Sequence, residues 1–354
     1  MGDEIEIRLT RLREVLANMG VDGCLVMSET NRFYLSGFTG SNGYLLITST
    51  LALLFTDPRY IERANDEAKN FEVCPLRNSY DELRELVSST GIIGIGFEDR
   101  EVSYAIYRVL SKVVGDSAQL VPLEEAINSL RAIKDRIELT VVEKSVAIAD
   151  EVMSIVISSL REGVTEKEVA WAVEGSLRES GADGLAFDTI VASGPNASRP
   201  HHKTGERSIQ LGDMVVIDMG ALYGGYRSDI TRTICIGKAD EQFRKIYHVV
   251  REAQASAEDL AGSGVKVAAL DTVAREVISS HGYGEYFSHA LGHGIGLDVH
   301  ELPRISGSSD EILSEGMVFT IEPGIYIPGW GGVRIEDMLV IDKGEARILT
   351  RSDK

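Results

Sequence analysis

The stretches MVVIDMG (residues 214–220) and MVFTIEPG (residues 317–324) decide how the second half of the chain folds. Each is an apolar run of strand type that ends at a glycine, and each carries one acidic side chain, Asp218 or Glu322, within the run. A buried carboxylate is costly unless a cation or a hydrogen-bond donor meets it. The two segments therefore predict strands whose acids need partners.

Three further segments place a ligand-type side chain beside a glycine turn or an apolar strand: Asp229 in YRSDITRT, His293 in ALGHGIGLDVHE and Glu336 in GGVRIEDM. For any single acid, an ion pair with Arg232 or Arg334 at the end of a sheet would be a sufficient explanation. If all four acids converge, they bring about four negative charges, which would repel one another and raise their pKa values unless cations balance them. Charge balance favours two divalent metal ions over one.

An internal repeat supports this convergence. The segment 163–181 begins and ends with glycine, and a similar segment, 264–282, follows at a displacement of 101 residues, from 163 to 264. Both have apolar residues at helical spacing, and Thr165 with Glu168 forms a capping-box pattern in the first copy. Each copy predicts an amphipathic helix that ends at its second glycine. Chance similarity of two amphipathic helices is the alternative.

After each repeated helix come a histidine segment and then a strand, a hairpin and a strand that carry two of the acids. Two such units facing each other would bring the four carboxylates to one axis, with His293 supplied by a connecting segment. The second half of the chain is therefore expected to be an α+β domain with an internal pseudo-twofold repeat.

The first part of the chain predicts a small α/β layer, with an amphipathic helix over residues 4–19 and strands near 23–27, 43–48, 52–56 and 92–97. The turn-like VPLEE and the charged RAIKDRIE, which starts a long helix, indicate a domain boundary. We place the two domains at residues 1–127 and 128–354.

Composition limits the classes of function. A chain of 354 residues with 44% hydrophobic content is long enough for two domains with real cores. The net charge of −19 argues against a nucleic-acid partner. The acidic start of the chain lacks the apolar core of a signal peptide, and no apolar run approaches a membrane span. Three widely spaced cysteines suit reduced thiols, so we expect a cytoplasmic protein without a membrane partner.

The ordered motifs DMG, SDITRT, HGIGLDVHE, EPGIYIP and VRIED, preceded by ASGPNASRPHH, resemble the pita-bread metallopeptidases, and within them the Xaa-Pro peptidases, prolidase and aminopeptidase P. The resemblance covers essentially the whole chain, because NRFYLSGFTGSNGYLLIT and LLFTDPRY are similar to the creatinase-like N-terminal domain of that branch. It implies a pita-bread catalytic domain. It also implies a homodimer, because in such families the N-terminal domain of one subunit approaches the cleft of the other. Arg199, where a small apolar residue is usual in the family, is a departure.

The resemblance also implies roles for single residues. Asp229 and Glu336 would bridge two metal ions, Asp218 would complete one site, and His293 with Glu322 would complete the other. Mn²⁺ or Co²⁺ is implied, while the hard carboxylate ligands also accept Zn²⁺ or Fe²⁺. Glu322 would act as the proton shuttle for a water held between the metals.

Histidines and arginines around these ligands complete the site that the resemblance implies. His201 and His300 would stabilise the scissile carbonyl, and the neighbouring His202 has no assigned role. The substrate-side residues would be His289, Arg304 and Arg334. Arg304, in HELPRI, resembles a prolidase arginine that could grip the carboxylate of a dipeptide. A surface arginine in a loop is the alternative, and Arg334 is expected beside Glu336 on one face of a strand.

The substrates expected from the resemblance are therefore small proline-containing peptides. The preferred hypothesis is a dipeptidase that cleaves the Xaa-Pro bond. An aminopeptidase P that removes the first residue of longer Xaa-Pro peptides is the alternative, and a non-catalytic peptide-binding protein of the same fold is the more remote one. Retention of all five ligand residues argues against the last.

Overall fold

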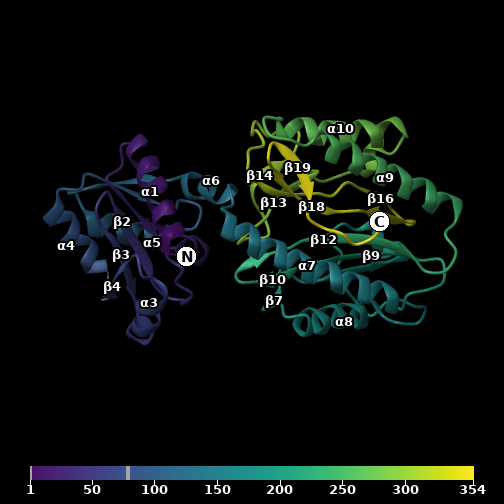
Figure 1. Ribbon diagram of the computed structural model, residues 1–354, viewed down its shortest axis with the longest axis horizontal. Helices are drawn as coiled ribbons and strands as arrows, with labels where there is room; N and C mark the ends of the chain where they lie inside the picture. Colours follow the sequence, from purple (N-terminus) through teal and green to yellow (C-terminus); the bar gives the residue numbers. More distant parts are fainter. Residues whose placement is uncertain (1, 77–79) are drawn as a thin grey trace. The chain divides into compact units, whose positions relative to one another are not determined.

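The computed structural model describes residues 2–76 and 80–354, which form two compact units, Met1–Arg131 and Ala132–Lys354 (Figure 1). The first unit is built around a mixed sheet that has, within its described residues, six strands in the order β4-β3-β2-β1-β5-β6. The strands are β1 (Gly23–Val26), β2 (Tyr44–Thr48), β3 (Ala52–Thr56), β4 (Glu72–Pro75), β5 (Gly94–Phe97) and β6 (Gln119–Pro122). The helices are α1 (Gly2–Asn18), α2 (Glu29–Ser36), α3 (Ile61–Glu67), α4 (Asp81–Thr90), α5 (Tyr104–Val114) and α6 (Ala126–Ala132).

The α/β layer predicted for this region is confirmed. The helix expected over 4–19 is α1, and its apolar positions Ile5, Leu9, Leu12 and Leu16 are buried. The four expected strands are β1, β2, β3 and β5. The helix α2 was not expected, and it is capped at its start by Ser28, whose side chain accepts a hydrogen bond from the Asn31 backbone N–H.

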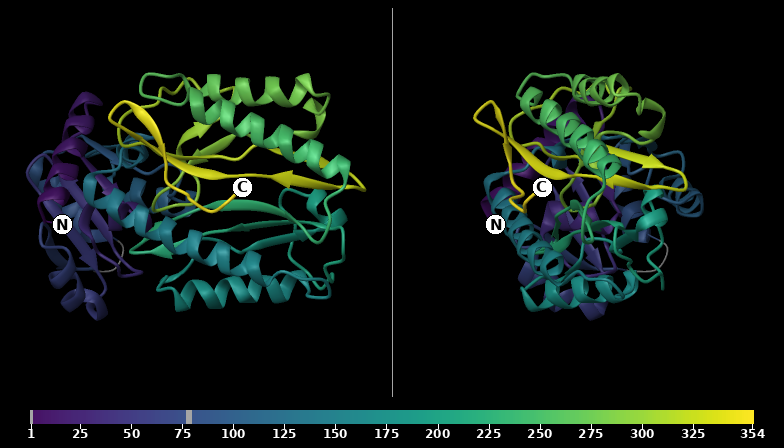
Figure 2. Two further views of the ribbon diagram at one scale, coloured as in Figure 1. Left: turned by 45° about the vertical axis from the view of Figure 1, so that its right-hand side comes forward. Right: turned by 90° about the vertical axis from the view of Figure 1, so that its right-hand side faces the viewer.

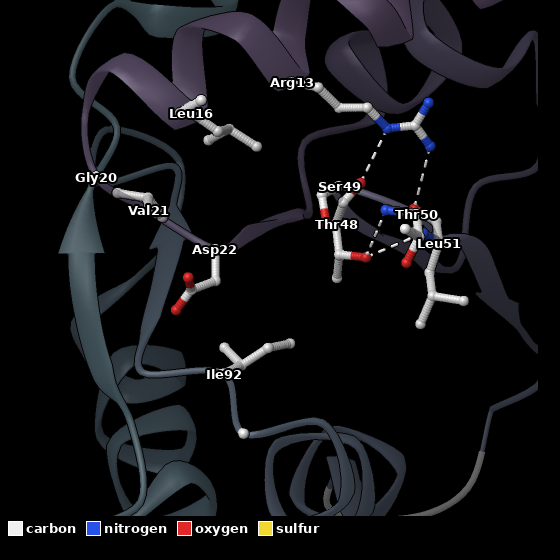
Figure 3. Close-up of a pocket in the computed structure, with 12 residues that line it drawn as sticks. Arg13, Leu16, Gly20, Val21, Asp22, Thr48, Ser49, Thr50, Leu51 and Ile92 are labelled. Carbon is white, nitrogen blue, oxygen red and sulfur yellow. Dashed lines mark hydrogen bonds between the residues drawn. The ribbon is translucent and has the colours of Figure 1, made fainter.

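A hollow of about 510 Å³ opens on the first unit between the end of α1 and the β2–β3 turn (Figure 3). Arg13 on its rim donates to two backbone carbonyls of that turn, Thr48 O at 2.9 Å and Leu51 O at 3.4 Å. The guanidinium therefore fastens the turn to α1. None of the predicted site residues lines this hollow.

The second unit consists of two similar halves. The first half has α7 (Arg136–Ser159), α8 (Glu166–Glu179), β7 (Gly184–Leu185), β8 (Ile190–Ser193), β9 (Met214–Met219), β10 (Ala221–Tyr223), β11 (Tyr226–Arg227) and β12 (Ile230–Cys235). The second half has α9 (Glu241–Leu260), α10 (Val267–Ser280), β13 (Gly292–Gly294), β14 (Glu301–Ile305), β15 (Val318–Ile321), β16 (Gly324–Ile327), β17 (Gly331–Arg334), β18 (Asp337–Asp342) and β19 (Glu345–Ile348). The helix pairs α7/α8 and α9/α10 cover opposite sides of the strands (Figures 1 and 2).

The predicted repeat is confirmed by the helix bounds themselves. The first residue of α8 is 166 and that of α10 is 267, the last residues are 179 and 280, and both displacements are 101 residues. Each helix is followed by its glycine in the left-handed region, Gly181 at φ +93° and Gly282 at φ +83°. The capping box of Thr165 and Glu168 is also present.

Each half has its own apolar core, and the two halves join through their strands. One core lies under α7 and α8, and the other lies under α9 and α10. At the seam, the Glu336 N–H donates to Thr231 O at 3.1 Å, and Thr233 Oγ1 donates to Arg334 O at 2.8 Å. Hydrogen bonds beside the acids therefore tie the two halves together, although their strands belong to separate sheets.

Among the described residues, no helix combines the length and the apolar character that crossing a bilayer requires.

Candidate metal centre

All five predicted ligand residues lie on strands of the second unit or directly beside them. Asp218 is in β9, Asp229 precedes β12, His293 is in β13, Glu322 follows β15, and Glu336 precedes β18. Antiparallel pairing of β9 with β12 places Asp218 opposite Thr231, and pairing of β15 with β18 places Ile321 opposite Asp337. Both acids of each half are thus brought to the same end of a strand pair.

The side chains of this set converge. Single ligand atoms of Asp229, His293 and Glu336 lie within 4.8 Å of one another. His293 Nε2 is 3.7 Å from Asp229 Oδ2 and 3.4 Å from Glu322 Oε1. The fifth residue, Asp218, is close enough for its charge to act on Asp229, Glu322 and Glu336.

Burial and mutual repulsion perturb the acids strongly. Burial, reinforced by the Asp218 charge, raises the pKa of Glu336 to about 8. Burial and the charge of Glu336 raise the pKa values of Asp229 and Glu322 well above their ordinary range. Without cations, this part of the chain therefore resists holding all of its carboxylates ionised.

Carboxylate oxygens without hydrogen-bond partners indicate that cations would relieve the repulsion between the acids. One oxygen of each of Asp218, Asp229 and Glu336 is buried and has no hydrogen-bond partner within residues 2–76 and 80–354. Buried acceptors are normally satisfied, so three such oxygens in one cluster of acids are unusual. Carboxylate oxygens with a single imidazole are a fitting donor set for divalent first-row metals.

The imidazole of His293 is oriented for ligation. Its Nδ1–H donates to the carbonyl of Gly294 at 3.1 Å, and its backbone N–H donates to Thr320 Oγ1 at 3.1 Å. Nε2 is then the nitrogen that faces the carboxylates with its lone pair. Burial and the neighbouring His300 lower the pKa of His293 to about 4, so the ring is neutral at pH 7, as a ligand must be.

Arg334 lies near Glu336, as expected, because both side chains hydrogen-bond the same Thr231 hydroxyl. The buried guanidinium donates from Nη2 to Asp218 Oδ2 at 2.6 Å and from Nε to Thr231 Oγ1 at 3.0 Å, and that hydroxyl donates to Glu336 Oε2 at 2.6 Å. Nη1 donates to the Tyr326 hydroxyl at 3.0 Å. Arg334 therefore orients two predicted ligands from behind.

The ion-pair alternative for single acids was partly right, because one oxygen of Asp218 does pair with Arg334. The other oxygen of Asp218 stays without a partner among the described residues. Arg232 pairs instead with Asp337 at 2.8 Å.

The three predicted histidines outside the ligand set lie around it. The ring of His300 is 4.3 Å from the ring of His293, centroid to centroid, and it is exposed. His201 is also exposed, and its charge helps to lower the pKa values of His289 and His300, for which burial is the main cause. His289 has partners at both nitrogens, Ala290 O at 2.8 Å and the Tyr326 hydroxyl at 2.9 Å.

Arg304 lies on β14 directly opposite His293 of β13. Directly opposed residues of an antiparallel pair have neighbouring side chains on one face of the sheet. Arg304 is exposed, and its guanidinium has no ion-pair partner in the part of the chain that the structure describes. The strand register therefore places Arg304 next to His293.

Sequence reasoning missed the polar residues that orient the site, chiefly Thr231, Thr320 and Tyr326. Thr231 and Thr320 each lie two residues from a predicted ligand, at the spacing that puts alternate strand residues on one face. That spacing was a usable signal. The sequence around Tyr326 gave no such signal, because its contact with His289 joins residues that are 37 positions apart.

Comparisons with known proteins agree with this geometry. The chain matches Metallopeptidase family M24 over residues 141–343 and the Creatinase/Prolidase N-terminal domain over residues 8–133. A protein of Pyrococcus furiosus named Xaa-Pro dipeptidase is 40% identical, with 98% of each chain covered.

Two solved structures are similar over nearly the whole length. The Xaa-Pro dipeptidase from Bacillus anthracis has a TM-score of 0.95 at 38% identity and covers 99% of this chain and 98% of its own. The X-Pro aminopeptidase from Thermotoga maritima has a TM-score of 0.88 at 39% identity and covers 94% of this chain and 96% of its own.

Proposed function

Because the chain belongs to metallopeptidase family M24 and carries the creatinase/prolidase N-terminal domain, we propose that it hydrolyses the Xaa-Pro bond of dipeptides with two divalent metal ions. The observation that carries the proposal is the convergence of Asp229, Glu322 and Glu336 on His293, together with three buried carboxylate oxygens, one each on Asp218, Asp229 and Glu336, that have no partner among the described residues. A non-catalytic binding protein would gain nothing from this costly arrangement.

The metals would be held by Asp218, Asp229, His293, Glu322 and Glu336. Mn²⁺ or Co²⁺ is the proposed pair, and Zn²⁺ or Fe²⁺ would also accept these ligands. When bound, the metals supply Lewis acidity, which lowers the pKa of a water molecule and stabilises negative charge on the substrate carbonyl.

The protein's own groups would move the proton and hold the peptide. Glu322, with Thr320 Oγ1 at 3.4 Å, is the proposed proton carrier between the attacking water and the proline nitrogen. The exposed imidazoles of His201 and His300 are proposed to donate hydrogen bonds to the scissile carbonyl oxygen as its charge develops. His289 and Arg334 keep their partners and support this side of the site through Tyr326.

Preference for dipeptides is proposed to come from Arg304. In a dipeptide the proline carboxylate lies one residue beyond the scissile bond, and a guanidinium beside the metal ligand His293 can bind it with two hydrogen bonds. In a longer peptide this position is a neutral amide, which would leave the guanidinium unpaired and weaken binding.

Removal of the first residue from longer Xaa-Pro peptides is the second candidate, since the Thermotoga maritima relative is named an aminopeptidase. The deciding experiment compares a Xaa-Pro dipeptide with a Xaa-Pro-Xaa peptide, using chelated protein and protein restored with Mn²⁺ or Co²⁺. Metal-dependent cleavage of the dipeptide alone supports the proposal. Preference for the longer peptide establishes the aminopeptidase, and no cleavage of either favours a binding protein.

We further propose a cytoplasmic homodimer whose substrate partners are small proline-containing peptides. The three free cysteines suit a reducing compartment, and the family resemblance supports the dimer. Sedimentation at assay concentration tests the dimer, and a single monomeric species would refute it. The division into domains at 127/128 also stays a prediction, which limited proteolysis tests.

A further inference from the structure

His202, the histidine that follows His201, does not point into open solvent. Its side chain is only 8% exposed, and its Nε2 lies 2.9 Å from Oε2 of Glu166. Glu166 is the first residue of α8, and its carboxylate is completely buried. The contact joins residues that are 36 positions apart in the sequence. It therefore ties the histidine segment to a rigid helix.

The Glu166 carboxylate accepts hydrogen bonds from several residues between β8 and residue 205. Its Oε1 accepts from the Ser193 backbone N–H at 2.8 Å, the Ser193 hydroxyl at 2.8 Å and Asn196 Nδ2 at 2.9 Å. Its Oε2 accepts from His202 and from the Gly205 N–H at 3.3 Å. Burial alone would raise the pKa of Glu166, but these hydrogen bonds bring the pKa below its ordinary value. The carboxylate is thus ionised, and both of its oxygens accept hydrogen bonds from this loop.

His201 stands between two fixed points. On one side, the carbonyl of Pro200 accepts from Arg334 Nη1 at 3.4 Å, and Arg334 also holds the predicted ligand Asp218. On the other side, His202 is held by Glu166. With both neighbours anchored, the backbone of His201 has little freedom, although its own side chain is exposed. An exposed imidazole is useful in a reaction only when something else fixes its direction.

We propose that Glu166 and His202 are positioning residues that hold His201 in its reactive direction, and this rests on the proposed function of His201 at the substrate carbonyl. The anchor is a charge-assisted hydrogen bond at the far side of the loop, so it acts without touching metal or substrate. The pair also gives the second histidine of the segment RPHH a role.

The experiment uses the full-length, metal-loaded protein and replaces His202 by asparagine or by glutamine. Glutamine places its amide nitrogen where Nε2 lies and keeps a donor for Glu166, whereas asparagine ends at the position of Nδ1 and falls short. We expect His202→Asn to lower kcat for a Xaa-Pro dipeptide roughly tenfold to hundredfold, with KM changed by less than about twofold. We expect His202→Gln to keep kcat within about threefold of the parent.

Two further readouts separate positioning from general damage. In a His201→Ala background, His202→Asn should lower kcat by less than about twofold, because the group that it positions is already absent. Hydrogen exchange of the peptide covering residues 199–206 should quicken in His202→Asn and not in His202→Gln, with metal content and the circular dichroism spectrum unchanged. This readout does not depend on turnover.

The outcomes distinguish this inference from the proposed function. If the parent protein cleaves no Xaa-Pro substrate, the proposed function fails, and faster exchange in His202→Asn alone still supports the anchor. Equal exchange in the parent and His202→Asn refutes the anchor. Faster exchange with unchanged kcat, or an undiminished effect of His202→Asn in the His201→Ala background, refutes positioning of His201.

Discussion

Stripped of divalent metal, the protein should lose stability as the pH rises from 6.5 to 8, and Glu336→Gln should reduce that loss by the share that Glu336 contributes. The Glu336 carboxyl has an ordinary pKa near 4.5 and a pKa of about 8 in the folded protein. A carboxyl with a raised pKa holds its proton in the folded state while the unfolded chain has released it, so stability falls with rising pH between these two values.

The magnitude follows from the same linkage. Between the two pKa values the slope is ~1.4 kcal/mol per pH unit, and it fades near pH 8, which leaves roughly 1.5 kcal/mol for the step from pH 6.5 to 8. Asp229 and Glu322, whose pKa values are also raised, add to this loss. Below pH 6.5 the opposite slope of His289 and His293, whose pKa values burial lowers to about 4, would obscure the effect.

The assay is urea denaturation in the presence of a chelator, followed by tryptophan fluorescence. The chain has two tryptophans, Trp171 and Trp330, and both lie in the second unit, so the signal reports on the unit that holds the site. Comparison with Glu336→Gln cancels other groups that titrate in this window, such as Glu258, whose pKa burial raises to about 7. Excess Mn²⁺ should restore the parent's stability at pH 8.

A matched control is Glu285→Gln, which changes an exposed acid of the same unit and should follow the parent. The reasoning is refuted if the chelated parent is equally stable at pH 6.5 and 8, or if Glu336→Gln loses as much stability as the parent does.

Other perturbations test other parts of the molecule. Asp229→Asn should lower kcat at least about a thousandfold, because a proposed metal ligand is lost, while the circular dichroism spectrum stays unchanged; turnover near the parent value in Mn²⁺ would contradict the proposed metal site. Arg304→Ala should raise KM for a Xaa-Pro dipeptide about tenfold or more, because the carboxylate loses its partner, and should not lower any residual cleavage of a tripeptide. An unchanged KM for the dipeptide would exclude a carboxylate anchor. Lys134→Met should destabilise the protein by about 3 kcal/mol, because it removes the ammonium that lies 2.6 Å from the buried Glu301 carboxylate. The control Lys167→Met, which breaks an ion pair at the surface, should cost less than about 1 kcal/mol in the same denaturation assay.

The parts of the fold that follow from local pattern could be predicted. Asp218 and Glu322 were visible as charges inside apolar runs, and the strands form where those runs lie. The two repeated helices were also predictable, since apolar spacing and flanking glycines are local features, and their bounds differ by the same 101 residues at both ends. In these places local preference and tertiary packing agree.

Contacts between distant segments could not be predicted. The hydrogen bonds of Arg334 with Asp218 and Thr231 were not foreseen, because they join residues that are 116 and 103 positions apart. An acid in the first turn of a helix, such as Glu166, is ordinarily explained by the helix dipole. The sequence around Glu166 does not indicate its hydrogen bond with His202, which lies 36 residues away. Such pairings depend on how the loops fold back, which periodicity does not encode.

The seam between the two halves has a consequence for the history of the chain. Asp218 and Asp229 belong to one half, and His293, Glu322 and Glu336 belong to the other. An ancestor with a single copy would have carried two of the acids and could have built a four-carboxylate centre only by pairing with a second, identical copy. Gene duplication would then have made that pairing permanent and freed the copies to diverge, so that one of them could acquire the histidine. Expressing the halves as separate chains would return the protein to that earlier condition, in which shared metal ions would help to hold the two chains together.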